Sequence, residues 1–104
     1  MPCFEVAFAH GLCWIEVDPH ARDLDAAFLA RMWLIEDDGR ARRPLVAADG
    51  APLEVHGSTV LRAVGSATTF LERRFGPLSE YAHICEDFGR PPQQGLPFVF
   101  HDLP

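Results

Sequence analysis

The chain has 104 residues, of which 48% are hydrophobic and 23% are charged, and its formal net charge is −6. This length and composition predict one globular domain spanning residues 1–104 and argue against a largely disordered chain. The negative balance disfavours non-specific binding to nucleic acid and to an anionic membrane, because both present negative charge.

The cysteine count points to a reducing compartment. Three cysteines cannot all pair within one chain, and so small an odd number argues against a secreted disulfide scaffold. Glu5 and Glu16 interrupt the N-terminal apolar stretch, which argues against a signal peptide and a transmembrane helix. We therefore expect a cytoplasmic protein. The chain contains arginine but no lysine, and we interpret this bias as a sign of a bacterial, GC-rich genome.

The N-terminal residues predict a β-hairpin. In residues 3–9, CFEVAFA, the aromatic and branched side chains alternate and share one face of a strand. A second strand-forming run, LCWIEV, follows directly after His10 and Gly11. We therefore predict a two-residue turn at His10-Gly11, in which glycine supplies the positive φ.

The next segment is typical of a helix start. An Asp-Pro pair provides an N-cap and a first helical residue, and apolar residues then recur at three- and four-residue steps. We predict a helix from about Pro19 or Asp23 to Arg31, followed by a strand to Glu36. The alternative is one long helix that ends at Gly39.

A second hairpin is indicated by the stretch PLVAADGAPLEV. Two short apolar runs, Leu45–Ala47 and Leu53–Val55, flank the dipeptide Asp49-Gly50. Asp-Gly between strand-like runs is a strong turn signal, so the two runs are predicted to pair.

Residues 58–75, STVLRAVGSATTFLERRF, predict the clearest helix. Apolar residues at positions 60, 64, 67, 71 and 75 form one stripe, and an opposite stripe is polar. Ser58 is the expected N-cap and Gly76-Pro77 the expected end. Gly65 is unfavourable by about 1 kcal/mol relative to alanine inside a helix, so we interpret it as room for close approach by a sheet or a second subunit.

The C-terminal part predicts two more strands, EYAHICE and LPFVFHDL, with Phe98 and Phe100 on one face of the last. Strands thus outnumber helices and are joined by hairpins. The predicted fold class is α+β, a largely antiparallel sheet with one or two helices packed on one face.

A histidine and a cysteine two residues apart raise the possibility of a metal site or a reactive thiol. On a strand, His83 and Cys85 project to the same face about 7 Å apart, close enough to bind one zinc ion with further ligands. His101, or His10 together with Cys13, are candidates for those ligands. The simpler interpretation is that Cys85 belongs to the core, since the spacing matches no known zinc motif.

The basic cluster GRARRP contains Arg40, Arg42 and Arg43. Three guanidinium groups in this pattern are able to bind an anion or an acidic partner. The alternative is that they solvate a hairpin tip, where several nearby acids neutralise much of their charge.

Apolar surface provides a second indication of binding. The segment from Phe28 to Ile35 is apolar on more than one face, and Trp14 and Trp33 add large aromatic surface. Large exposed apolar patches mark interfaces, where tryptophan and arginine contribute most of the binding energy. The alternative is that packing within the domain covers both faces.

Together these features predict a small binding or accessory domain that acts through protein–protein or small-ligand contacts as a homodimer. Its predicted binding residues are Trp14, Trp33, Arg40, Arg42 and Arg43. No cofactor is indicated, and an enzyme is the less favoured interpretation. The alternative is a Cys/His-dependent enzyme or metal-binding protein in which His83, Cys85 and His101 form the site.

Overall fold

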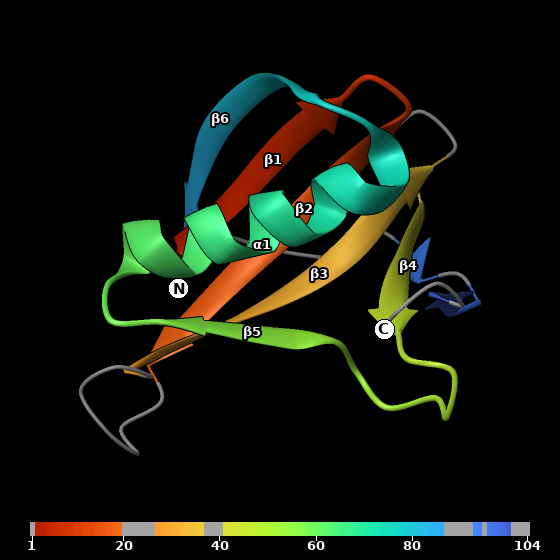
Figure 1. Ribbon diagram of the computed structural model, residues 1–104, viewed down its shortest axis with the longest axis horizontal. Helices are drawn as coiled ribbons and strands as arrows, with labels where there is room; N and C mark the ends of the chain where they lie inside the picture. Colours follow the sequence, from red (N-terminus) through yellow and green to blue (C-terminus); the bar gives the residue numbers. More distant parts are fainter. Residues whose placement is uncertain (1, 20–26, 37–40, 87–92, 95, 101–104) are drawn as a thin grey trace.

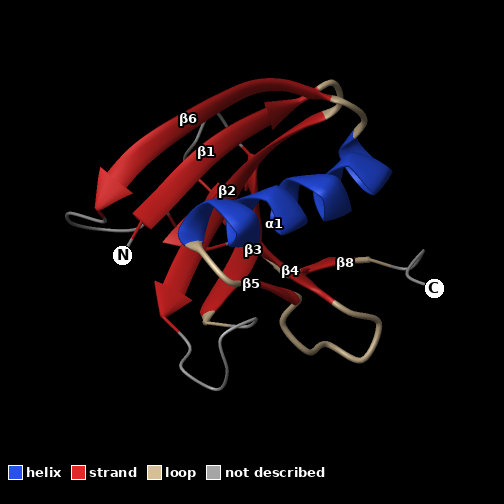
Figure 2. Ribbon diagram, turned by 60° about the vertical axis from the view of Figure 1, so that its left-hand side comes forward, coloured by secondary structure: helices blue, strands red, loops and turns tan. Residues whose placement is uncertain are grey.

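A computed structural model describes residues 2–19, 27–36, 41–86, 93–94 and 96–100. Within these ranges, residues 81–86 and 93–94 are described by their backbone alone. The fold is α+β, with a mostly antiparallel mixed sheet and a helix packed against one of its faces (Figure 1; Figure 2). The predicted fold class is confirmed.

The strands are β1 (Pro2–Phe8), β2 (Gly11–Pro19), β3 (Phe28–Glu36), β4 (Ala41–Val46), β5 (Glu54–Gly57), β6 (Leu78–Glu86), β7 (Gln93–Gln94) and β8 (Phe98–Val99), and the helix is α1 (Val60–Phe75). The sheet order is β6-β1-β2-β3-β4-β7, with β5 beside β3 and β8 beside β4. β7 and β8 run parallel to β4, whereas the other pairs are antiparallel. We call the face of the sheet turned away from α1 the outer face.

The N-terminal hairpin is confirmed, but its turn lies one residue earlier than predicted. Phe8 pairs with Gly11, which leaves Ala9 and His10 as the turn residues. Gly11 therefore belongs to β2 and is not among the glycines with positive φ. A Cβ atom at this position would lie 2.6 Å from Cδ1 of Phe75, so glycine makes room for that ring.

The helix predicted between the second and third strands is wrong at its beginning and at its end, where the structure has strands instead. Pro19 is the last residue of β2, and Phe28 to Arg31 belong to β3. The predicted strand to Glu36 is confirmed and the single long helix is wrong, while residues 20–26 lie outside the described part of the chain. β3 has buried residues on both faces, so successive apolar positions imitate helical spacing.

The second predicted hairpin is half right. Gly50 has a φ of 87° and Oδ1 of Asp49 accepts a hydrogen bond from the N–H of Ala51 at 2.9 Å, so the turn forms. The two arms, however, meet only at the isolated bridge between Val46 and Pro52. β5 instead pairs with the beginning of β3, and β4 pairs with its end, so both lie along one edge of β3.

Helix α1 is confirmed, with a corrected N-cap. Thr59, and not Ser58, caps it, because Oγ1 of Thr59 accepts a hydrogen bond from the N–H of Arg62 at 3.1 Å. Gly76 ends the helix as predicted, with a φ of 82° and its N–H donating to the Glu72 carbonyl at 3.1 Å. The buried face consists of Ala63, Val64, Ala67, Leu71 and Phe75.

The core lies between α1 and the sheet, and the C-terminal segment closes one end of it. Alternate residues of β1, β2 and β3 point toward the helix and are buried. Phe100 stacks on Phe70 with ring centroids 5.1 Å apart, and Phe98 contacts Phe75 at 5.8 Å. Phe98 and Phe100 thus pack in one aromatic cluster, but of the described residues in the predicted strand LPFVFHDL only Phe98 and Val99 are strand, as β8.

The apolar segment from Phe28 to Ile35 is largely covered. Apart from Arg31, its residues are buried or half-buried. Among the described residues, the large exposed hydrophobic side chains are instead Leu61, Leu78 and Leu96. Packing within the chain therefore accounts for this segment, in line with the alternative interpretation. In the described part of the chain, no helix is long and apolar enough to cross a membrane.

Candidate functional site

The structure brings together three of the predicted binding residues on the outer face. Trp14 of β2 and Trp33 of β3 are cross-strand partners, and both are half-buried. Arg42 of β4 reaches Trp14, with Cζ of its guanidinium 4.7 Å from the centroid of the Trp14 ring. Trp14, Trp33 and Arg42 thus lie together on the outer face. We call the two contacting residues the Trp14–Arg42 pair.

The other two arginines of the basic cluster do not join this pair. Arg43 donates from Nε to the Leu96 carbonyl at 2.8 Å, from Nη2 to the Pro97 carbonyl at 3.3 Å, and from Nη1 to Oε1 of Glu36 at 3.3 Å. These bonds hold the segment before β8 against β4. Arg40 lies outside the described residues.

The histidine and cysteine of the alternative site lie in strand β6, as predicted. The backbone register places His83 opposite Phe4 and Cys85 opposite Cys3. The side chains of His83 and Cys85 lie outside the described residues, as does His101. The metal or thiol site at these residues therefore stays a prediction.

The structure does not support His10 and Cys13 as further ligands of the predicted metal site. His10 lies in the exposed β1–β2 turn, whereas Cys13 is fully buried in the core beneath α1. Burial raises the pKa of the Cys13 thiol from 9.0 to about 12, because a thiolate is poorly solvated there. Metal binding and nucleophilic attack both need the thiolate, so Cys13 is a core residue. No group of three potential metal ligands occurs among the side chains that the structure describes.

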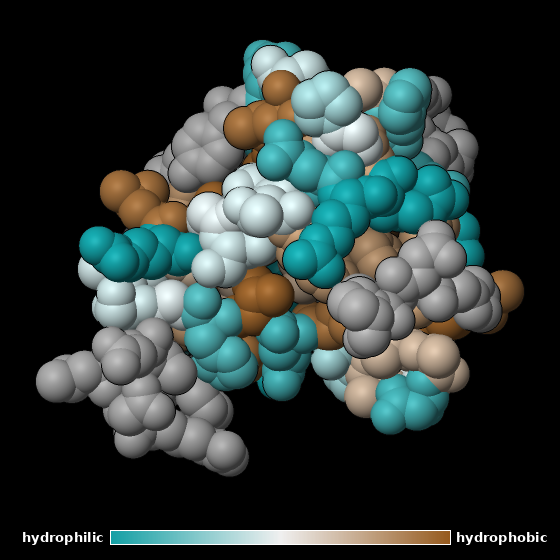
Figure 3. Space-filling model, viewed as in Figure 1, coloured by the Kyte–Doolittle hydropathy of each residue, from teal (hydrophilic) through white to brown (hydrophobic). Residues whose placement is uncertain are grey.

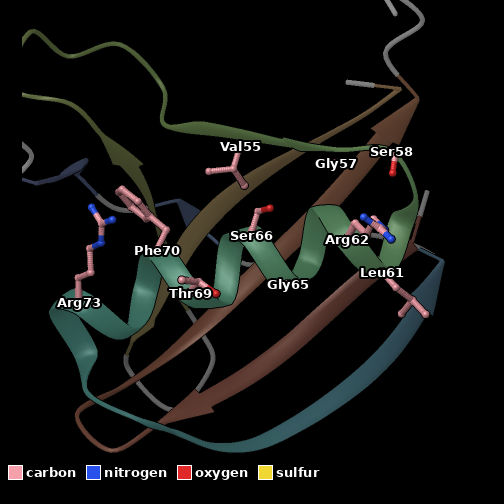
Figure 4. A pocket seen from close by; sticks show the side chains of 10 residues that line it. All are labelled: Val55, Gly57, Ser58, Leu61, Arg62, Gly65, Ser66, Thr69, Phe70 and Arg73. Carbon is pink, nitrogen blue, oxygen red and sulfur yellow. The ribbon is translucent and has the colours of Figure 1, made fainter. Parts of the chain in front are cut away.

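A groove of about 940 Å³ runs between β5 and α1 (Figure 4). Its walls come from the edge strand on one side and from the helix face opposite the core on the other. It is lined by Val55, Gly57, Ser58, Leu61, Arg62, Gly65, Ser66, Thr69, Phe70 and Arg73. We call it the β5–α1 groove.

The β5–α1 groove is closed at one end and widens toward the other. At the closed end the helix touches the strand, since a Cβ atom on Gly57 would lie 2.3 Å from the backbone nitrogen of Ala63. From there β5 and α1 diverge, and Val55, Ser66 and Phe70 point into the space between them (Figure 4). The floor of the groove thus combines apolar side chains with a hydroxyl group.

The charge of this groove is opposite to that of the chain. Its lining includes Arg62 and Arg73 and no acidic residue, although the net charge of the protein is −6. Both arginines are exposed, and neither forms an ion pair with any residue that the structure describes. Negative charge on an incoming ligand would therefore meet two available guanidinium groups.

Gly65 lies midway along the groove and leaves space that the chain does not fill. A Cβ atom built there meets no other atom within 4 Å. In the space-filling view, pale side chains over the middle of α1 separate strongly hydrophilic ones toward its two ends (Figure 3). The sequence interpretation of Gly65 as room for a sheet is therefore not met within the chain, and the space remains open to a partner.

Sequence reasoning found the groove only in part. The opposite stripe of the helix, which includes Arg62, Ser66, Thr69 and Arg73, was predicted as polar, and these residues are exposed. The second wall was missed because β5 was expected to pair with β4. Comparison with protein-family models, curated proteins and solved structures gave no match for this chain.

Proposed function

We propose that this chain is a binding domain that holds an extended, acidic segment of a partner protein in the β5–α1 groove. The observation that carries the proposal is the unfilled space at Gly65 between Arg62 and Arg73. Glycine inside a helix is unfavourable by about 1 kcal/mol relative to alanine. Because no residue that the structure describes occupies that space, we propose that a bound segment uses it.

The proposed ligand is extended because one wall of the groove is a strand. β5 pairs with β3, and no described strand pairs with the opposite edge of β5. A peptide that lies along such an edge can form main-chain hydrogen bonds while its side chains contact the neighbouring helix. This mode gives affinity from the backbone and specificity from the residues of α1.

The spacing of the arginines sets the length of the ligand. Arg62 and Arg73 are about 16 Å apart along the helix axis, at 1.5 Å per residue. An extended chain advances about 3.3 Å per residue. Acidic residues five positions apart in the partner would therefore face the two guanidinium groups, with small or branched residues between them over Gly65 and Ser66.

Charge favours another protein over a second copy of this chain in the groove. In a two-fold symmetric contact the same patch meets itself, so Arg62 and Arg73 would face like charges. A head-to-tail contact between copies would not close and would form chains of molecules. The homodimer predicted from the sequence gains no support from the groove and stays a prediction.

A peptide titration tests the proposal. The probe is a fluorescein-labelled hexapeptide with glutamate at both ends and alternating valine and serine between them, and its binding is followed by fluorescence anisotropy. We expect saturable binding that weakens about tenfold in the double variant Arg62→Gln/Arg73→Gln, since exposed ion pairs contribute about 0.2–1 kcal/mol each. Binding should also weaken as salt increases.

Arg74→Gln is the matched control, because Arg74 lies on the same helix but stacks over the ring of Phe98 rather than lining the groove. This variant should bind the peptide as the unchanged protein does. Equal binding by the double variant, or equal binding of a peptide with lysine in place of glutamate, would refute the proposal. Sedimentation of the free protein adds a second check, since a dimer that dissociates in the double variant would make a second copy the occupant.

A further inference from the structure

The outer face holds a buried cation with no described anionic partner. Arg42 is 5% exposed and is the buried charged residue among those that the structure describes. It forms no ion pair with any of them. A buried charge is strongly unfavourable unless it is paired and hydrogen-bonded. The ring of Trp14 offsets part of that penalty by its contact at 4.7 Å.

Two hydrogen-bond donors of this stacked pair are also unused. The Nε atom of Arg42 and the indole Nε1 atom of Trp14 are both buried, and neither has a hydrogen-bond partner in the described part of the chain. Buried N–H groups are nearly always satisfied in folded proteins, so two orphans on one pair of touching residues are unusual. Both orphans are donors, so the group that would satisfy them is an acceptor.

The surroundings of the pair are mixed. Arg42 lies between Ile35 of β3, which is buried, and Gln94 of β7. Trp14 lies between Trp33 of β3 and Glu5 of β1, so the anion has to bind at the Arg42 side of the pair, away from the Glu5 carboxylate. A buried guanidinium interacts more strongly with an anion than it does in water. Arg43 cannot contribute a second charge, because the contacts of its guanidinium are with Glu36, the carbonyls before β8 and the ring of Phe98.

We propose that the Trp14–Arg42 pair is a binding site for the carboxylate of a small organic molecule, separate from the β5–α1 groove. A guanidinium stacked over a ring directs its N–H groups outward along its edge, and a planar carboxylate matches that edge with two acceptor oxygens once Arg42 or Trp14 moves to uncover it. One arginine neutralises one negative charge, which favours a monoanion over a phosphate dianion. Trp33, the cross-strand neighbour of Trp14, adds half-buried aromatic surface for the organic part of the ligand.

Benzoate is the test probe, because it combines a carboxylate with a flat apolar ring. The two donor atoms are covered in the free protein, so binding has to move Arg42 or Trp14, and tryptophan fluorescence reports that movement. We expect saturable quenching and a raised Tm with benzoate, at an ionic strength fixed with chloride. Trp14→Phe keeps an aromatic ring and removes the indole N–H, and it should weaken benzoate binding about three- to tenfold while Trp33 still reports.

Arg42→Met removes the cation and keeps an apolar side chain of similar length. We expect this variant to lose the saturable response while its Tm without benzoate equals or exceeds that of the unchanged protein, because an unpaired buried charge has gone. Arg31→Met is the control on the same face; Arg31 is exposed and pairs with Glu54 at 2.8 Å, and this variant should bind benzoate normally.

Four results would overturn the proposal. The first two are the absence of any saturable change with benzoate, and the same change in Arg42→Met as in the unchanged protein. A clear loss of Tm in Arg42→Met without benzoate would show that the charge is already compensated within the chain. A larger response to phosphate than to benzoate would assign the pair to inorganic anions instead.

Discussion

The two faces of helix α1 use their residues in opposite ways. Toward the sheet, Ala67 and Leu71 are fully buried, and Ala63, Val64 and Phe75 are buried beside them. Toward the groove, Gly65 leaves open space, and Ser66 and Thr69 are exposed. The first face stabilises the fold, whereas the second accepts a residue that weakens the helix. This contrast separates residues that hold the domain together from residues available to a partner.

The largest expected effect is on the sheet-facing side. Leu71→Ala should lower the free energy of unfolding by about 2–5 kcal/mol, because it removes a fully buried side chain and leaves a cavity. The matched substitution on the same helix is Leu61→Ala, since Leu61 is 72% exposed and lines the groove. Its effect in urea denaturation should stay within about 0.5 kcal/mol. Similar losses for the two leucines would remove the contrast.

The next largest expected effect is on the pH dependence of stability, and it comes from the thiol of Cys13 beneath α1. The pKa of Cys13 is raised to about 12 in the fold, against 9.0 for an ordinary thiol. Above pH 9 the unfolded chain releases this proton while the folded chain keeps it, so stability falls as pH rises toward 12. The limiting slope is about 1.4 kcal/mol per pH unit.

The check is urea denaturation of the protein and of Cys13→Ala at pH 7, 9 and 10.5. The stability of the unchanged protein should fall more steeply above pH 9 than that of the variant, which lacks the thiol. Parallel pH profiles would mean that Cys13 titrates normally and is less buried than the structure indicates.

Alanine substitutions at two glycines are expected to give the smallest changes in stability, and these changes have opposite signs. Gly57→Ala should destabilise the protein by about 1–3 kcal/mol, because the new Cβ would press on the backbone of Ala63. Gly65→Ala should stabilise it by up to about 1 kcal/mol, because the space there is open and alanine favours the helix. Thermal unfolding of the two variants should therefore shift in opposite directions. A loss of stability in Gly65→Ala would show that the chain itself needs this glycine.

Local patterns predicted the parts of this fold that depend on neighbours in sequence. The apolar stripe of α1 and the alternating residues of β1 each follow from a single repeat in the local sequence, and both elements were predicted correctly. β3 was misread because its two faces are both covered, so Phe28 and Met32 fit a helix as well as a strand. The N-cap moved from Ser58 to Thr59, which are chemically equivalent candidates one residue apart.

The two candidate sites depend on contacts between distant residues, which local patterns do not contain. The β5–α1 groove exists because β5 pairs with β3 rather than with β4. The Trp14–Arg42 pair depends on the register of three strands. Residue type alone singled out Trp14, Trp33 and Arg42, but nothing in the sequence separates Arg42 from Arg43, which faces the other side.

The most direct test of the account follows backbone amides of the ¹⁵N-labelled protein by NMR while the acidic hexapeptide is added. The groove predicts chemical-shift changes at Gly57, Gly65 and their neighbours in β5 and α1, saturating together, with the Trp14 indole N–H unchanged. Shift changes confined to the outer face of the sheet, or none in β5 and α1, would contradict the claim that this groove is where the protein binds its partner.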